Sequence, residues 1–127
     1  MTTRTVLVVD NEPFNLDLVQ TILARGGFDV ITAASGPESI DLVRERRPDL
    51  VLMDLQLPEM DGLEATRRIL ADPATGDARI VAYSAMVMPS DRDRARQAGC
   101  VGFIAKPVGA RELIALVSSY LEENRLP

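Results

Sequence analysis

The stretch "DLVLMDLQLPEMDG", residues 49–62, holds the feature that decides the fold, an apolar run that ends in a carboxylate. Residues 50–53 are an uninterrupted Leu-Val-Leu-Met, which is typical of a strand buried on both faces of a parallel sheet. This run ends at Asp54, and a second apolar run, residues 6–9, also ends at an acid, Asp10. Because an ionised carboxylate is costly to bury without a partner, the sequence must supply something that faces these acids.

Strand-like and helix-like segments alternate along the whole chain. The apolar, strand-like runs are residues 6–9, 29–33, 50–53, 78–83 and 101–105. Such alternation predicts a parallel sheet with helices on both faces. We therefore predict an α/β fold, a flavodoxin-like doubly wound sandwich with a five-stranded parallel sheet of order 2-1-3-4-5. A fragment of a Rossmann sheet would need a glycine-rich turn after the first strand, and residues 10–13, Asp-Asn-Glu-Pro, do not form one.

One of the predicted helices differs from the others in composition. Residues 90–98 are strongly charged and have almost no apolar face, so we expect this helix to be weakly anchored and mobile. An apolar loop, Met86-Val87-Met88, leads into it. Adaptable Met side chains suit contact with a partner protein, and packing of the loop against the sheet is the alternative interpretation.

The composition is that of an ordinary globular domain. The chain has 127 residues, 46% of them hydrophobic and 26% charged, so we expect a single domain over residues 1–127 with no output domain. The formal net charge is −5 and no basic run occurs, which argues against a nucleic-acid partner or an anionic membrane surface. No apolar stretch is long enough to cross a bilayer and no leader precedes the first strand, so we expect a cytoplasmic protein with no membrane partner.

The absence of histidine and the presence of one cysteine, Cys100, restrict the chemistry further. Zinc sites of the usual kinds are excluded, as are Ser-His-Asp and Cys-His catalytic sets. An intrachain disulfide is also impossible, which fits a reduced compartment. Carboxylates, hydroxyls, lysine and backbone groups remain, and these favour hard cations such as Mg²⁺ together with phosphate chemistry.

The predicted strand order brings the two acids together. In the order 2-1-3-4-5 the topological switch point lies between the first and third strands, where ligands bind outside the carboxyl ends. Asp10 and Asp54 follow those strands, and close carboxylates stay ionised together only with a cation between them, a role that suits Mg²⁺. The fourth and fifth strands end in the same crevice with Ser84 and Lys106. This set suits an anion such as phosphate, held by a metal on one side and an ammonium on the other.

The combination resembles a response-regulator receiver domain of two-component signalling. The residues that carry the resemblance are Asp10 before Asn11, Asp54 in "LMDLQLPEMDG", Ser84-Ala85, and Phe103 with Lys106-Pro107. The resemblance covers essentially the whole chain. The stretches "DLVLMDLQLPEMDGLE" and "AGCVGFIAKP" are most similar to stand-alone single-domain receivers of the DivK kind.

The resemblance implies a role for each of these residues. Asp54 would be the phosphoacceptor, modified by a histidine kinase or histidine phosphotransferase with Mg²⁺ as cofactor. The implied metal ligands are Asp10, Asn11, Asp54 and the backbone carbonyl of Gln56. The implied phosphoryl-binding groups are Ser84, the amide of Ala85, and Lys106. Ser84 and Phe103 would form a conformational switch, and the Lys106–Pro107 peptide bond would be cis.

One position departs from the family pattern and leaves alternatives open. Receivers usually carry a second acid where this chain has Asn11, whose amide oxygen can ligate Mg²⁺ but brings no charge. Asn is also a favoured helix cap, so Asn11 could act in capping alone. A second hypothesis is therefore a phosphorylation-independent pseudo-receiver, an interaction module with a weakened metal site. A phosphohydrolase of the haloacid-dehalogenase type is disfavoured, because that family has a second Asp at the position of Gln56.

Together with the resemblance, these features predict a single-domain response regulator and not an enzyme, although it would assist its own phosphorylation and dephosphorylation. We expect the signal to leave by contact with a downstream protein through the face around residues 86–121, or by onward phosphotransfer. We expect a monomer or a weak dimer.

Overall fold

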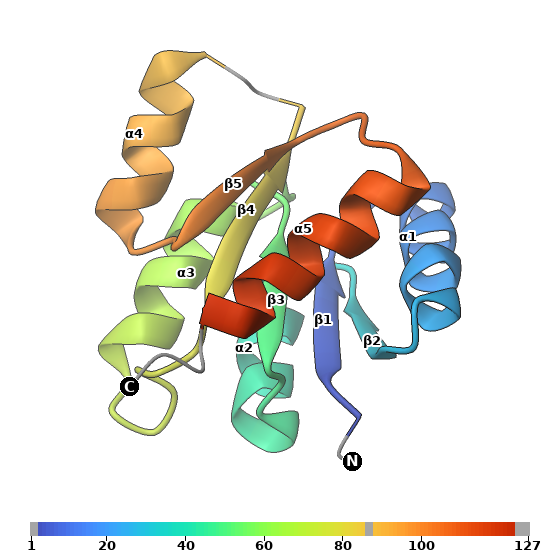
Figure 1. Ribbon diagram of the computed structural model, residues 1–127. Helices are drawn as coiled ribbons and strands as arrows, with labels where there is room; N and C mark the ends of the chain where they lie inside the picture. The colour runs from blue at the N-terminus through green and yellow to red at the C-terminus, as the bar shows by residue number, and fades with distance from the viewer. Residues whose placement is uncertain (1–2, 86–87, 124–127) are drawn as a thin grey trace.

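A computed structural model describes residues 3–85 and 88–123 of the chain, in which strands and helices alternate (Figure 1). The strands are β1 (Thr5–Val9), β2 (Asp29–Ala33), β3 (Leu50–Met53), β4 (Ile80–Ser84) and β5 (Gly102–Ala105). The helices are α1 (Pro13–Arg25), α2 (Gly36–Arg46), α3 (Gly62–Ala71), α4 (Pro89–Ala98) and α5 (Ala110–Glu123). None of these helices is long and apolar enough to cross a membrane, a finding that applies to the described residues.

The strands form one parallel sheet in the order β2-β1-β3-β4-β5. This confirms the predicted fold and strand order. The register places the last residues of three strands side by side, because Val9 of β1 pairs with Ala33 of β2 and with Met53 of β3. Asp10 and Asp54 each follow one of these paired residues, so the strand pairing itself brings the two acids to the same edge of the sheet.

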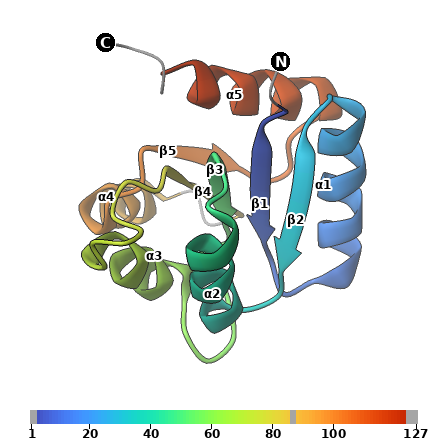
Figure 2. The ribbon, with the colours of Figure 1, turned by 90° about the horizontal axis from the view of Figure 1, so that it is seen from below.

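Helices cover both faces of the sheet and bury two separate apolar clusters. Figure 2 shows α1 and α5 on one side and α2, α3 and α4 on the other. On the first side, the helices contribute Val19 and Leu23 of α1 and Leu113, Val117 and Leu121 of α5. Burial of each such Leu or Val side chain stabilises the fold by roughly 1.5–3 kcal/mol.

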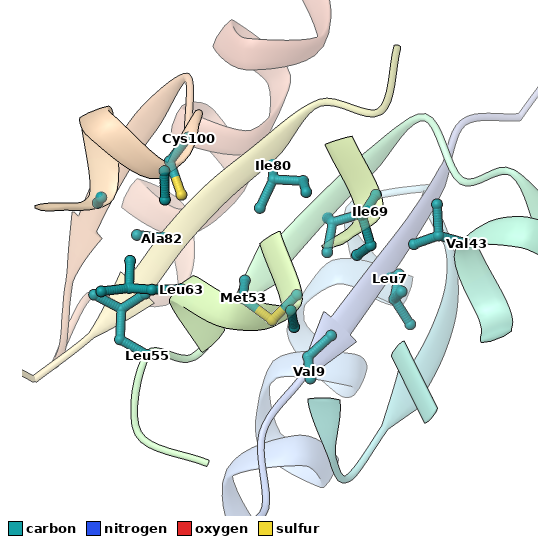
Figure 3. Close-up of a cluster of buried hydrophobic side chains, with 14 of the residues drawn as sticks. Leu7, Val9, Val43, Met53, Leu55, Leu63, Ile69, Ile80, Ala82 and Cys100 are labelled. Carbon is teal, nitrogen blue, oxygen red and sulfur yellow. The ribbon is translucent and has the colours of Figure 1, made fainter. Parts of the chain in front are cut away.

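The second apolar cluster lies between the sheet and α2, α3 and α4 (Figure 3). Its labelled side chains in the figure are Leu7, Val9, Val43, Met53, Leu55, Leu63, Ile69, Ile80, Ala82 and Cys100. The strand residues on the two faces alternate, so that Leu7 and Val9 of β1 face this cluster while Val6 and Val8 face the other. This burial on both faces explains why residues 6–9 of β1 and all of β3 are apolar.

Helix α4 is anchored by small residues and local contacts. Its buried residues are Asp91, Ala95 and Ala98, and the Asp91 carboxylate accepts a hydrogen bond of 3.0 Å from the Met88 backbone N–H. The Arg92 guanidinium lies 4.6 Å from the centre of the Phe103 ring on β5. The helix thus buries two alanines and an aspartate but no large apolar side chain, which agrees with the predicted near absence of an apolar face. Met86 and Val87 of the predicted apolar loop lie outside the described residues, and Met88 is 64% exposed.

Candidate functional site

Two buried carboxylates lie side by side at the carboxyl edge of the sheet. Asp10 is 1% exposed and Asp54 is 6% exposed. Their backbones continue the sheet pairing, since the Asp10 N–H donates to the Ala33 carbonyl and the Asp54 N–H donates to the Val9 carbonyl, each at 3.0 Å. The ends of β1 and β3 therefore fix the position of both acids.

The two carboxylates are oriented in the same way by their own loops. One oxygen of Asp10, Oδ1, accepts a hydrogen bond of 2.9 Å from the Glu12 N–H. The Oδ1 of Asp54 accepts one of 2.9 Å from the Gln56 N–H. Each is a turn in which an Asp side chain binds the backbone two residues on. These turns use one oxygen of each carboxylate and leave the other oxygen, Oδ2, available for a further contact.

A single ammonium contacts both of these free oxygens. Lys106 Nζ lies 2.8 Å from Asp10 Oδ2 and 3.2 Å from Asp54 Oδ2. Lys106 follows β5 directly, its backbone N–H donates to the Ser84 carbonyl at 2.9 Å, and its peptide bond to Pro107 is cis. Its ammonium also lies 4.8 Å from the centre of the Tyr83 ring, which forms a cation–π contact. Lys106 is therefore the positively charged partner that the two buried carboxylates need.

Burial and charge shift the ionisation of this group of residues. Burial raises the pKa of Asp54, the charge of Asp10 adds to this, and the Gln56 N–H and Lys106 partly oppose it. Burial alone would lower the pKa of Lys106, but the hydrogen bond to Asp10 and the charges of Asp54 and Asp10 outweigh it, and the pKa is raised. Lys106 is therefore held as an ammonium, while Asp54 is ionised at a cost in solvation.

A pocket of about 370 Å³ opens above these side chains. Its lining consists of Asp10, Asn11, Glu12, Asn15, Asp54, Gln56, Ala85 and Lys106. The predicted site residues Asn11, Gln56 and Ala85 thus share one pocket with the two acids and the lysine. Of the other predicted residues, Ser84 is fully buried at the end of β4, and Phe103 packs beneath α4 on the α2–α3–α4 side of the sheet.

Two lining residues, Glu12 and Asn15, were not predicted as part of the site. Glu12 follows Asn11 in the loop after β1, and Asn15 lies one helical turn after Asn11. The signal that could have identified them was their spacing from Asp10 at the start of α1.

The structure also contradicts the interpretation of Asn11 as a helix cap. The N-cap residue of α1 is Glu12, and its side chain makes no capping hydrogen bond.

The oxygen donors of the pocket fit a magnesium ion. Both free carboxylate oxygens already contact one cation, the Lys106 ammonium, so their geometry allows a single cation to bridge them. Carboxylate, amide and backbone carbonyl oxygens are suitable Mg²⁺ ligands, and Mg²⁺ completes its shell with water. Among the described residues, no three acidic or cysteine side chains lie close enough together to hold a metal by themselves. A magnesium ion here would therefore depend on two carboxylates, neutral oxygens and water.

Comparison with known proteins agrees with this geometry. Residues 6–118 match the family described as the response regulator receiver domain. The chain is 38% identical over 119 residues to the polar-differentiation response regulator DivK of Brucella ovis, and the match covers 94% of this chain and 97% of that protein. The DivK of Brucella anthropi is 37% identical over 118 residues, and the match covers 93% of this chain and 96% of that protein.

Solved receiver structures show the same architecture. The receiver domain of the sensor histidine kinase PA1611 from Pseudomonas aeruginosa PAO1 matches with a TM-score of 0.87 and 30% identity over 95% of this chain and 99% of that one. That structure contains a magnesium ion coordinated in the active site cleft. A putative response regulator from Chloroflexus aurantiacus J-10-fl matches with a TM-score of 0.89 and 28% identity over 95% of this chain and 99% of the other.

Proposed function

Because the chain belongs to the response regulator receiver domain family, we propose that it accepts a phosphoryl group on Asp54 and that this modification switches its contacts with partner proteins or is relayed onward. The observation that carries the proposal is the pairing of two buried carboxylates with one ammonium at the floor of an open pocket. This arrangement gives Asp54 a route to solvent and a cation beside it. We further propose that the chain acts as a single receiver domain, in the cytoplasm, as a monomer or weak dimer.

The proposed step is transfer from a phosphohistidine of a histidine kinase or histidine phosphotransferase. A carboxylate oxygen of Asp54 attacks the phosphorus, a P–O bond forms, and the P–N bond to the histidine breaks, so that the imidazole keeps the electron pair and takes up a proton. The raised pKa of Asp54 favours attack, because a more basic carboxylate is a better nucleophile. Bound by Asp10, Asn11, Asp54 and the Gln56 carbonyl, Mg²⁺ would supply positive charge for the phosphoryl oxygens.

The chain's own groups would hold the transferred phosphoryl group. Lys106 can keep its contact with Asp10 at 2.8 Å and turn its remaining N–H groups towards a phosphoryl oxygen. Ala85 lines the same pocket, and Ser84, the last residue of β4, directly precedes it. Their donors are the Ala85 backbone N–H and the Ser84 hydroxyl. We assign these three groups to phosphoryl binding, since charge-assisted hydrogen bonds to such oxygens are among the strongest in proteins.

The route from the phosphoryl group to a partner would run along β4 and β5. In the strand register Ala82 pairs with Phe103 and Ser84 pairs with Ala105. A shift of Ser84 towards the phosphoryl group would change the space next to Phe103, which also contacts Arg92 of α4. We propose that the face around residues 86–121, where Met88 and Val101 are exposed, reports this change to a downstream protein.

A second surface suits the docking of the phosphodonor. Phe14 is 76% exposed and Leu18 is 48% exposed, one turn apart on α1. Asn15, which lies between them in sequence, lines the pocket. Two exposed apolar side chains beside the entrance are what an amphipathic helix of a kinase or phosphotransferase would cover.

Intact-mass measurement after incubation with acetyl phosphate and Mg²⁺ tests the proposal. We expect one phosphoryl adduct, absent from Asp54→Asn and retained in Asp17→Asn, which neutralises an exposed acid on α1 outside the pocket. An adduct that persists in Asp54→Asn would refute the assignment of the phosphoacceptor. The second candidate, a phosphorylation-independent interaction module, is favoured by the neutral Asn11 and predicts no adduct at any Mg²⁺ concentration.

A further inference from the structure

The proposed metal site has less negative charge than a dipositive ion requires. Two carboxylates, Asp10 and Asp54, face the pocket, and the Lys106 ammonium contacts both. With all three groups ionised, the set carries a single net negative charge. Asn11 lines the same pocket, but its amide adds only a neutral oxygen. A Mg²⁺ ion bound by these groups alone would leave an uncompensated positive charge.

A third carboxylate, that of Glu12, belongs to the lining of the same pocket. Its position is fixed relative to the site, because its backbone N–H donates to Asp10 Oδ1 at 2.9 Å. Its side chain is exposed and forms no capping hydrogen bond to α1. Within residues 3–85 and 88–123, no hydrogen bond or ion pair engages the Glu12 carboxylate. This carboxylate is therefore free to turn towards a cation in the pocket.

The distances rule out direct ligation by all three acids in the observed conformation. Over the described part of the chain, no three acidic side chains converge closely enough to hold a metal. Mg²⁺ ordinarily keeps several of its waters when it binds through one or two carboxylates. The pocket volume of about 370 Å³ leaves room for such waters, each of which occupies roughly 30 Å³ in the liquid. A carboxylate at the pocket wall can accept hydrogen bonds from these waters.

We propose that Glu12 provides the negative charge that Asn11 lacks, by accepting hydrogen bonds from waters of a Mg²⁺ ion held by Asp10 and Asp54. This inference rests on the proposed function, since it concerns the same metal site. Glu12 is thus a positioning residue for the hydrated ion and not a direct ligand. Its carboxylate is then needed because position 11 is neutral, so its contribution should decrease when position 11 becomes acidic.

Mg²⁺ titration by isothermal calorimetry of the unphosphorylated full chain tests this inference. The variants are Glu12→Gln, Asn11→Asp, the double variant, and Asp17→Asn as a control that removes one charge from α1 outside the pocket. We expect Glu12→Gln to weaken Mg²⁺ binding about tenfold, the lower end of the effect of groups that orient metal ligands. Asp17→Asn should change the affinity much less, because an exposed charge at a distance is screened by salt. Circular dichroism of each variant without metal checks that it is folded.

The double variant separates compensation from a general charge effect. If Glu12 replaces the missing acid, Glu12→Gln should cost clearly less affinity in the Asn11→Asp background than in the wild-type background. Equal affinities of Glu12→Gln and Asp17→Asn would overturn the inference, as would an equal loss in both backgrounds. These outcomes leave the proposed function intact if the wild-type chain binds Mg²⁺ and forms the Asp54 adduct. A wild-type chain that binds no Mg²⁺ would instead refute the metal site itself.

Discussion

At the scale of single residues, the site is a compromise between burial and charge at Asp54. The carboxylate is almost inaccessible to solvent, and this loss of hydration is the main reason that its pKa is raised. The Lys106 ammonium and the Gln56 N–H offset only part of that cost. A carboxylate kept in this state is less stable as an anion in the folded protein than in the unfolded chain, which is a property suited to a nucleophile that awaits modification.

This balance predicts how Asp54→Asn changes stability with pH. Because the pKa of Asp54 is higher in the folded state, the folded protein binds this proton more tightly, and stability is lost as the pH rises from the unfolded pKa through the folded pKa. Replacement by the neutral amide, with Lys106 still bonded to Asp10, should therefore raise the thermal midpoint of the metal-free protein at pH 7. The gain should shrink as the pH falls through the raised pKa of folded Asp54 towards the pKa of unfolded Asp. Thermal unfolding between about pH 4 and 7, which covers ordinary and raised carboxyl pKa values, measures this gain in midpoint.

The control for this measurement is Asp17→Asn, which changes the net charge equally at an exposed site. A midpoint of Asp54→Asn below that of the wild type at pH 7 would show that the ion pair with Lys106 outweighs the burial of the carboxylate.

A second residue-scale prediction concerns Asn11→Asp. The new carboxylate should tighten Mg²⁺ binding, with an upper limit of about 8 kcal/mol for a unit charge ~4 Å from a dipositive ion at an effective dielectric near 20, before desolvation and repulsion reduce it. It should also lower the thermal midpoint without metal, because three carboxylates would then share one crevice. Calorimetric titration and metal-free thermal unfolding measure the two effects. Helix capping does not complicate the test, since Glu12 and not Asn11 is the N-cap of α1. Unchanged values of both quantities would remove Asn11 from the metal site.

At the scale of elements, the start of α3 is what shapes the loop behind Asp54. The Gly62 N–H donates to the Leu55 carbonyl at 3.2 Å, and the Asp61 carboxylate caps the helix by accepting a bond from the Glu64 N–H. A Cβ on Gly62 would lie only 2.0 Å from the backbone carbonyl oxygen of Asp54. The glycine therefore allows α3 to start directly against the backbone of Asp54, whose carbonyl group is held in place and could not make room for a side chain.

Gly62→Ala should consequently destabilise the protein by about 1–3 kcal/mol, the usual range for overpacking a tight contact, and it should also weaken Mg²⁺ binding by displacing Asp54. Urea unfolding and calorimetric titration give the two values. The matched control is Gly109→Ala, because no atom lies within 4 Å of a Cβ at that glycine. A Gly62→Ala protein as stable as Gly109→Ala would show that the loop after β3 relaxes without cost.

The elements also show which features could be read from the sequence. Apolar runs and their flanking acids were sufficient to predict β1, β3 and the sheet order, because a strand buried on both faces leaves an unambiguous pattern. The start of β4 was predicted at residue 78, but the strand begins at Ile80, since the Ala78 N–H is used in a turn with Thr75. The anchoring of α4 left little signal, because its buried residues are two alanines and an aspartate.

At the scale of the whole molecule, the topology explains why the site could be predicted in outline and not in detail. Parallel strand ends meet at one edge of the sheet, so the sequence positions of Asp10, Asp54 and Lys106 were enough to predict that they converge. The bridging contact of Lys106 to both acids and the presence of Glu12 in the pocket depend on loop conformations and side-chain rotamers. The Lys106 contacts join residues far apart in the chain, and no local pattern encodes them. Glu12 is held instead by a local hydrogen bond to Asp10, so its spacing from Asp10 was the signal available in the sequence.

The same topology predicts that a ligand at this edge stabilises the entire fold. The pocket takes residues from the loops after β1, β3, β4 and β5, so unfolding any of these strands removes part of the site. Mg²⁺ should therefore raise the global thermal midpoint, by an amount equivalent to about 2.7 kcal/mol when its concentration is one hundred times the dissociation constant. Thermal unfolding over a series of Mg²⁺ concentrations measures this, and Asp10→Asn should abolish the dependence. A midpoint that rises equally in Asp10→Asn would assign the stabilisation to general ionic strength and not to a metal bound between the two strand-end acids.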